Sequence, residues 1–256
     1  MVKAVDGETD IHCILYRPPD FDPHRKYPVV EVIYAGPQFA VIPRTFVPSE
    51  YGQSAQAIAQ LGFVTVIIDA RGTPYRGKAF QDVVYRSIGR NEIPDHVAAL
   101  RQLGERYSYM DLTRVGVHGK SWGGYFVLRA MLQAPETYHV GVASAVVADL
   151  TTTAQSPVEP YMSLPEDNPE GYAYANCLNL ADRLAGMLLI TIGTADVNTP
   201  FSETMRMVDA LIQAGKPVDL LVFPGQHHWL QGEYLNYFFQ AVGRYFVEHL
   251  KPRDAG

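Results

Sequence analysis

The sequence predicts an α/β fold in which a mostly parallel, doubly wound sheet carries helices on both faces. The first observation is that apolar runs such as 28–34, 63–68 and 187–192 are continuous rather than alternating, which is typical of strands buried on both sides. The second is that helical patterns separate these runs along the chain. The third is that neither a repeat nor a linker interrupts the 256 residues, so we expect one domain over 1–256.

The N-terminal part supplies the first half of this sheet. Its strands are short apolar runs bounded by Gly, Pro or Asp, and its longer helix is marked by apolar residues at helical spacing. The segments without a period are expected to be irregular. The expected elements are strands at 11–16, 28–34 and 63–68, helices at 55–61 and 93–107, and irregular segments at 39–51 and 73–90.

The C-terminal part continues the alternation of strand and helix. Thr199 and Pro200 are typical of a helix start, and Gly215 and Pro217 of its end. The last helix has one apolar face that includes Leu235, Phe238, Phe239, Val242 and Phe246. The expected elements are a strand ending near residue 118, a helix from 122 to 134, strands at 140–147, 187–192 and 218–223, and helices at 199–214 and 234–250.

The stretch from about 149 to 186 breaks this rhythm. It is rich in Thr, Pro, Tyr and Ala, and four of its residues are prolines. We interpret it as a cap-like insertion over the catalytic edge of the sheet, where segments that shape substrate binding usually lie.

Composition excludes several classes of function. A net charge of −6 without a dense Lys/Arg run argues against nucleic acid or an anionic membrane as partner. The N-terminus has no apolar core of signal-peptide length, and no run is long enough to span a bilayer, so a cytoplasmic location is expected if Met1 is the natural start. Cys13 and Cys177 lack metal-site spacing, and whether they pair stays open. We expect no metal and no cofactor, and a homo-oligomer is compatible with the sequence.

A Gly-Lys-Ser-Trp-Gly-Gly motif at 119–124 is the strongest functional signal in the chain. An apolar run with Val115 and Val117 precedes it, and a helical pattern follows it. A serine in this strand–turn–helix context is held on a strained elbow above the end of a parallel sheet. Glycines flank the turn because a Cβ there would collide with the neighbouring strand or helix. Ser121 is therefore the predicted nucleophile.

An acid and a base follow the serine in the order that an α/β-hydrolase requires. Asp196 comes after the strand at 187–192, and the pair His227 and His228 comes after the strand at 218–223. A serine hydroxyl needs such a base and a carboxylate that orients it. The alternative interpretation of Asp196 is a helix-terminal acid favoured by the helix dipole. His118 is a rival base, but its position at a strand end indicates a packed, hydrogen-bonded side chain.

These motifs resemble the catalytic domain of the prolyl oligopeptidase family, and most of all its dipeptidyl peptidase IV branch. The resemblance rests on Gly-Lys-Ser-Trp-Gly-Gly-Tyr, Gly-Thr-Ala-Asp-Val-Asn and Phe-Pro-Gly-Gln-His-His, and on Tyr-Ala-Gly-Pro at 34–37. It implies that His228 is the base, that Tyr34 and the backbone N–H of Trp122 hold the oxyanion, and that Asn198 binds a substrate carbonyl. It also implies that the primary pocket is lined by Tyr125, Val146 and Val147.

Two departures from the family accompany this resemblance. The branch carries a propeller domain before the hydrolase, and these 256 residues contain none. It also carries two pocket tyrosines where this sequence has Thr153 and Pro157, so cleavage after proline does not follow from the resemblance.

The sequence predicts a serine hydrolase that acts through an acyl-enzyme on a peptide or a small ester. The resemblance implies a prolyl-oligopeptidase-like peptidase. The alternative is a broad carboxylesterase on the same fold, which the missing propeller and the altered pocket favour. A non-catalytic interaction module would lack a member of the triad, and all three members are present in the sequence.

Overall fold

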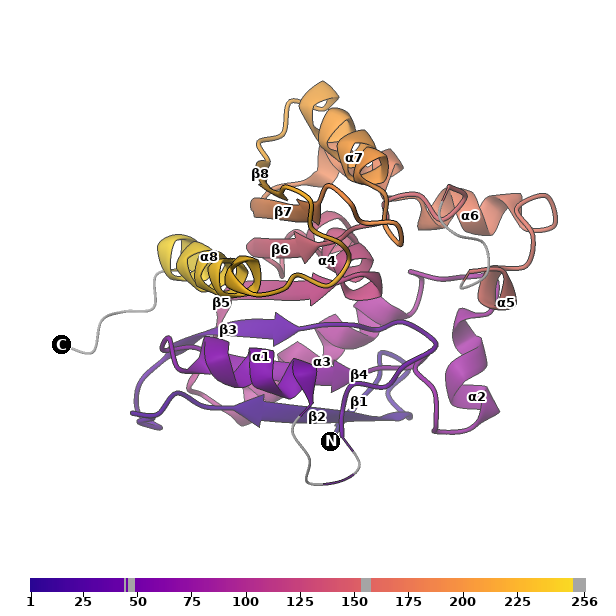
Figure 1. Cartoon of the computed structure of the whole chain (residues 1–256). Coiled ribbons are helices and arrows are strands. Elements are labelled where there is room, and N and C mark those ends of the chain that lie inside the picture. Colours follow the sequence, from indigo (N-terminus) through magenta and orange to yellow (C-terminus); the bar gives the residue numbers. More distant parts are fainter. Residues whose placement is uncertain (44, 46–48, 153–157, 251–256) are drawn as a thin grey trace.

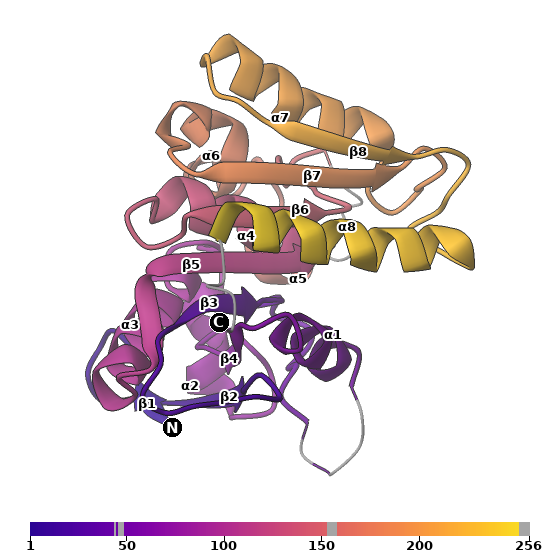
Figure 2. The same ribbon diagram turned by 90° about the vertical axis from the view of Figure 1, so that its left-hand side faces the viewer.

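An eight-stranded sheet forms the centre of the molecule in the computed structural model, which describes residues 1–43, 45, 49–152 and 158–250. The strand order is β1-β2-β4-β3-β5-β6-β7-β8, which Figure 2 shows from one edge to the other. The pairs from β4 to β8 are parallel, and β1 and β2 join the edge antiparallel. The strands are β1 (Val2–Lys3), β2 (Asp10–Tyr16), β3 (Tyr27–Val32), β4 (Val64–Asp69), β5 (Met110–Lys120), β6 (Val140–Ser144), β7 (Met187–Gly193) and β8 (Asp219–Phe223).

Helices cover both faces of the sheet (Figure 1), as the continuous apolar strands predicted. Helices α1 (Glu50–Ala59) and α8 (Glu233–Leu250) pack on one face, and α3 (Glu92–Arg106), α4 (Trp122–Gln133) and α7 (Phe201–Gln213) pack on the other. The sheet order, its mostly parallel pairing and the two helical layers are those of an α/β-hydrolase. The shorter elements are α2 (Lys78–Gln81), η1 (Asp82–Val84), α5 (Glu159–Met162), α6 (Pro169–Ala175) and η2 (Cys177–Arg183).

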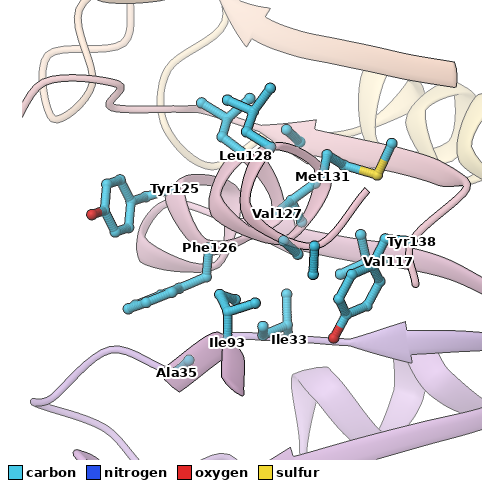
Figure 3. Close-up of a cluster of buried hydrophobic side chains, with 14 of the residues drawn as sticks. Ile33, Ala35, Ile93, Val117, Tyr125, Phe126, Val127, Leu128, Met131 and Tyr138 are labelled. Carbon is cyan, nitrogen blue, oxygen red and sulfur yellow. The ribbon is translucent and has the colours of Figure 1, made fainter. Parts of the chain in front are cut away.

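Helix α4 is the most deeply buried helix and sits at the centre of the larger core cluster. Figure 3 shows its apolar side chains, among them Phe126 and Val127, close to Ile33 of the β3 end and Val117 of β5. Every residue from 123 to 132 is buried, including Arg129. A helix held on all sides fixes the position of its own first turn, and that turn follows Ser121 directly.

The structure corrects several expected boundaries. Strand β1 is only two residues long and leaves no periodic pattern in the sequence. Helix α1 begins at Glu50 rather than at 55, because the Ser49 side chain accepts a hydrogen bond from the Gly52 N–H and caps it. Residues 73–90, expected to be irregular, include α2 and η1. The strand expected at 140–147 ends at Ser144.

The insertion expected at 149–186 holds the short helices α5, α6 and η2 in its described part. Cys13 and Cys177 are both free thiols. Of the described helices, none combines the length and the apolarity that a bilayer span requires.

Candidate active site

Ser121 lies on a sharp turn between β5 and α4. Its backbone angles are φ 60° and ψ −120°, a strained conformation for a residue with a side chain. Its N–H donates to the Ser144 carbonyl at 2.9 Å, which ties the turn to β6. A Cβ on Gly119 would lie 2.6 Å from the Ile33 carbonyl oxygen, and one on Gly123 would lie 2.4 Å from it. The two glycines therefore allow the end of β3 to approach the elbow, as the sequence predicted.

Asp196 and His228 form a buried hydrogen-bonded pair. The Nδ1 atom of His228 lies 2.8 Å from Oδ2 of Asp196, and the two residues are only 8% and 5% exposed. Because β7 and β8 are parallel neighbours, the loops that follow them meet at one edge of the sheet. Donation from Nδ1 to the carboxylate leaves Nε2 as the nitrogen available to accept a proton. Both residues line the same pocket as Ser121.

Thr199 anchors the carboxylate of Asp196, a role that the sequence analysis missed. Its hydroxyl donates to Oδ2 at 2.8 Å and its N–H to Oδ1 at 3.0 Å, and the N–H of Asn198 reaches Oδ1 at 2.9 Å. Burial alone would raise the pKa of Asp196, but the hydrogen bonds from His228 and Thr199 outweigh it, and the pKa is lower than usual. Asp196 is therefore held ionised beside the imidazole.

The other two histidines near the site have different settings. His118 is buried in β5, its Nδ1 lies 3.3 Å from the Val142 carbonyl oxygen, and its ring contacts Phe238. Burial lowers the pKa of His118 to about 4, so this imidazole stays neutral. It is packed and hydrogen-bonded, as expected for a structural residue. His227 is exposed and lines the same pocket as His228.

Tyr34 follows the end of β3 and borders the site. Its ring is held edge-on by Phe39 and Tyr51, with centroids 5.8 and 5.5 Å away. The Nε2 atom of Gln38 donates to its hydroxyl oxygen at 2.9 Å, which leaves the hydroxyl proton available for another acceptor. Burial raises the pKa of Tyr34 to about 12, so the phenol keeps this proton at neutral pH.

A backbone donor lies directly after the nucleophile. Trp122 is the first residue of α4, and the first hydrogen bond of that helix runs from the Tyr125 N–H to the Ser121 carbonyl at 3.0 Å. The N–H of a first helical residue has no acceptor within its own helix. The positive end of the helix dipole adds to its attraction for an anion. The Trp122 N–H and the Tyr34 hydroxyl are thus two donors beside one serine.

Two pockets meet at Ser121 and Tyr34, which line both. The smaller one, here called the Trp122 pocket, has a volume of about 330 Å³. The larger one, here called the His228 pocket, has a volume of about 500 Å³ and extends toward α1 and α8. The Trp122 pocket is lined on its apolar side by Trp122, Tyr125, Val147, Leu150, Val158 and Val197. The His228 pocket includes Glu50, His118, Lys120, His227, His228 and Trp229.

The structure brings most of the predicted pocket residues together but not all of them. Tyr125, Val147 and Asn198 line the Trp122 pocket, and the Tyr125 hydroxyl donates to the Ala175 carbonyl at 2.9 Å. Val146, also expected to line it, is not among its lining residues, and its side chain is fully buried in the core beside α4. The chain leaves β6 at Ser144, and Ala145 turns with φ 49°, so strand alternation no longer decides which way the next residues face. Thr153 and Pro157 lie outside the described residues.

The described part of the chain contains no group of three or more His, Cys, Asp or Glu side chains arranged to hold a metal ion. The chemistry that this site offers is that of a serine, an imidazole, a carboxylate and two hydrogen-bond donors on the walls of two pockets that share Ser121.

Comparison with known proteins places the chain in a family. The model of the prolyl oligopeptidase family matches residues 49–253. Dipeptidyl peptidase 8 of Homo sapiens is 36% identical over 221 residues, which cover 85% of this chain and 24% of the human protein. The chain therefore spans about a quarter of the length of this relative.

Solved structures support the same placement. Dipeptidyl peptidase 4 of Porphyromonas gingivalis superimposes with a TM-score of 0.88 at 31% identity, covering 97% of this chain and 35% of the other. A protein of Bacteroides ovatus superimposes with a TM-score of 0.90 at 35% identity, again over 97% of this chain and 35% of the other.

Proposed function

The chain belongs to the prolyl oligopeptidase family of serine peptidases, and from this premise we propose that it is a serine hydrolase that cleaves peptide bonds through an acyl-enzyme. The observation that carries the proposal is the buried Asp196–His228 pair, which faces the same pocket as Ser121 on its strained turn. An alternative built on an interaction module would have no use for a desolvated imidazole–carboxylate pair beside a strained serine.

The first half of the proposed reaction forms the acyl-enzyme. The Ser121 hydroxyl oxygen attacks the substrate carbonyl carbon while Nε2 of His228 accepts the hydroxyl proton. Asp196 holds the imidazole through Nδ1 and stabilises its positive charge. The Trp122 N–H and the Tyr34 hydroxyl donate to the oxygen as it becomes negative. Collapse of this intermediate breaks the bond to the leaving amine, which takes the proton from His228.

The second half of the reaction releases the acyl group. Water attacks the ester on Ser121 while His228 accepts its proton, and the same two donors hold the second oxyanion. His228 then returns the proton to Ser121, which restores the enzyme and frees the carboxylic acid. These steps need only side chains of this chain, its backbone and water.

We propose peptides as the substrates, because the relatives are named dipeptidyl peptidases. The apolar walls of the Trp122 pocket suit a small apolar side chain, and apolar contact discriminates weakly, by about 1–3 kcal/mol per methylene group. We therefore expect only a modest preference for proline at the cleaved position. A thousandfold preference for a Gly-Pro-anilide over Gly-Ala- and Gly-Phe-anilides would contradict this expectation. The homo-oligomer stays a prediction, which light scattering after size-exclusion chromatography tests.

Labelling with a fluorophosphonate probe tests the proposed function directly. The parent protein is expected to be labelled stoichiometrically and to hydrolyse dipeptidyl-anilides, and Ser121→Ala is expected to lose both properties. Ser144→Ala is the matched control, because Ser144 also lines the His228 pocket and its buried hydroxyl has no hydrogen-bond partner among the described residues. Labelling that survives in Ser121→Ala, or a parent that neither reacts nor hydrolyses, would contradict the proposal.

A further inference from the structure

The two pockets beside Ser121 receive different halves of a substrate. In acyl transfer, the base that takes the serine proton later gives it to the leaving group, so the leaving group must lie next to that base. His228 lines the larger pocket, and the lining of the smaller pocket includes Ser121 and Trp122 but no histidine. If the proposed function holds, the His228 pocket therefore receives the leaving amine and the Trp122 pocket receives the acyl group.

Lys120 places a cation in the wall of the His228 pocket. It precedes Ser121 and lies two residues after His118 on β5, so both side chains leave the strand on the face covered by α8. Its Nζ atom lies 3.4 Å from the centroid of the Trp229 ring. No carboxylate of the described residues forms an ion pair with it. Burial lowers the pKa of Lys120 to about 8, and the attraction of the Glu50 and Asp196 carboxylates offsets only part of this effect.

The acidic side chains near Lys120 are either hydrogen-bonded to other residues or exposed to solvent. Asp196 is bonded to His228 and Thr199, and Glu50 lies exposed at the first turn of α1. The imidazoles of His118, His227 and His228 line the same pocket and add no negative charge. The Lys120 ammonium group thus contacts the Trp229 ring and lines an open pocket. Such a group can bind an external anion.

The remaining lining of the His228 pocket indicates what kind of molecule carries this anion. Its outer wall is apolar and aromatic, with Trp229, Leu230, Leu235, Phe238 and Phe239. A volume of about 500 Å³ has room for an amino-acid residue with its side chain. The occupant that fits is an apolar or extended amine that carries a carboxylate.

We propose that Lys120 binds a carboxylate on the leaving group, so that this chain prefers peptide bonds whose leaving amine carries such a carboxylate. The charge comes either from a free C-terminal carboxylate, as in a tripeptide that loses its last residue, or from an acidic side chain directly after the cleaved bond. The inference rests on the proposed function for the identity of the leaving group, and on the geometry of Lys120 for its charge.

Paired peptides separate these two sources of charge. Gly-Ala-Phe with a free carboxylate is compared with its amide, and amidated Gly-Ala-Glu is compared with amidated Gly-Ala-Gln. The measurement is kcat/KM for release of the third residue, followed by mass spectrometry. The parent protein is expected to favour the charged member of at least one pair by tenfold or more, a magnitude usual for a charge-assisted hydrogen bond. The pair that shows the preference identifies the source of the carboxylate.

Substitutions at Lys120 test whether this residue causes the preference. Lys120→Met keeps an apolar stem over Trp229 and removes the charge, so the ratio between paired peptides is expected to fall to within about threefold of unity. Lys120→Arg is expected to retain most of the ratio. Lys26→Met is the matched control, because Lys26 is exposed directly before β3, at the amino end of the parallel strands, whereas Lys120 lies at their carboxyl end. Glu50→Gln removes a competing negative charge from the pocket and is expected to increase the ratio about twofold.

Binding measurements distinguish a failure of this inference from a failure of the proposed function. The same peptide pairs are titrated calorimetrically into Ser121→Ala, in which no bond is cleaved. A binding preference without hydrolysis by the parent would support the carboxylate site and contradict the proposed function. Hydrolysis by the parent with a ratio near unity in both pairs, or an unchanged ratio in Lys120→Met, would overturn the carboxylate site and leave the proposed function standing.

Discussion

The two pockets that meet at Ser121 distinguish substrates by different physical means. The Trp122 pocket has apolar walls on α4 and on the segment after β6, and its discrimination depends on shape. The His228 pocket contains an ammonium group and three imidazoles among several aromatic rings, and the discrimination proposed for it depends on charge. Shape differences between apolar groups are worth about 1–3 kcal/mol per methylene, whereas a charge without a partner decides binding more sharply. In the proposed reaction, Ser121 therefore acts between an acyl pocket that selects by shape and a leaving-group pocket that selects by charge.

The largest expected effect is a loss of kcat that does not depend on the acyl group or on the leaving group. His228→Ala is expected to lower kcat by several orders of magnitude with every acyl group and every leaving group, because the loss of the base affects each proton transfer. His227→Ala, the adjacent exposed histidine, is expected to keep most of the activity. Circular dichroism checks that both variants fold. The reverse pattern between the two histidines would overturn the assignment of the base.

Substitution of Tyr34 is expected to lower kcat less, again for every acyl group and every leaving group. Tyr34→Phe removes one hydroxyl and almost no volume, and loss of an oxyanion donor lowers kcat about a hundredfold or more. KM is expected to change little, since the donor acts on charge that develops in the transition state. The measurement is steady-state kinetics on anilides that differ only in the acyl group. A change confined to KM would mean that Tyr34 merely contacts the substrate.

The third prediction affects the acyl side alone. Val147→Phe places a larger side chain in the wall of the Trp122 pocket, where Val147 is 8% exposed. The ratio of kcat/KM for Gly-Phe-anilide to that for Gly-Ala-anilide is expected to fall about tenfold, in line with steric exclusion of a large apolar group. The ratio between peptides with charged and neutral leaving groups is expected to stay unchanged. A parallel change in both ratios would show that the pockets are not independent.

The smallest predicted effect is a pH dependence of the leaving-group side. With a pKa of about 8, Lys120 is roughly nine-tenths charged at pH 7 and roughly one-tenth charged at pH 9. The preference for a charged leaving group is therefore present below pH 8 and declines above it, by about fivefold between pH 7 and pH 9. The groups that face Lys120 are Glu50, Asp196, His118, His227 and His228. The Gly-Ala-Phe pair measured across this range checks the prediction, and a ratio that rises with pH would contradict it.

The sequence was sufficient to predict the fold class and the place of the proposed triad. Parallel strands end at one edge of a sheet, so residues after the strands at 187–192 and 218–223 had to meet near the serine elbow. Continuous apolar runs also predicted helices on both faces, and the structure confirms them. These features depend on patterns that repeat over many residues.

Features decided by a single residue were not predictable in this way. Thr199 was expected to begin a helix, but α7 starts at Phe201 and the free hydroxyl bonds Asp196 instead. The positive φ of Ala145 ended a strand and moved Val146 into the core. Lys120 occupies the first unspecified position of the Gly-x-Ser-x-Gly pattern, and the fold shows which face of β5 its side chain follows. Each of these features depends on the local backbone conformation, which the hydrophobic periodicity of the sequence does not determine.

The order of the strands along the chain also determines the order in which the proposed site residues are synthesised. The serine elbow follows β5, at the middle of the sheet, whereas the acid follows β7 and the base follows the edge strand β8. During synthesis from the N-terminus, the nucleophile, its oxyanion donors and β6 are made before either partner exists. Among the described strands, β8 lies at the edge of the sheet and pairs with β7 alone, so the proposed base is made after the serine and the acid and follows an edge strand. If His228 is the base, as proposed, a growing chain carries Ser121 without a base, and the proposed site is complete only after β8 has paired with β7.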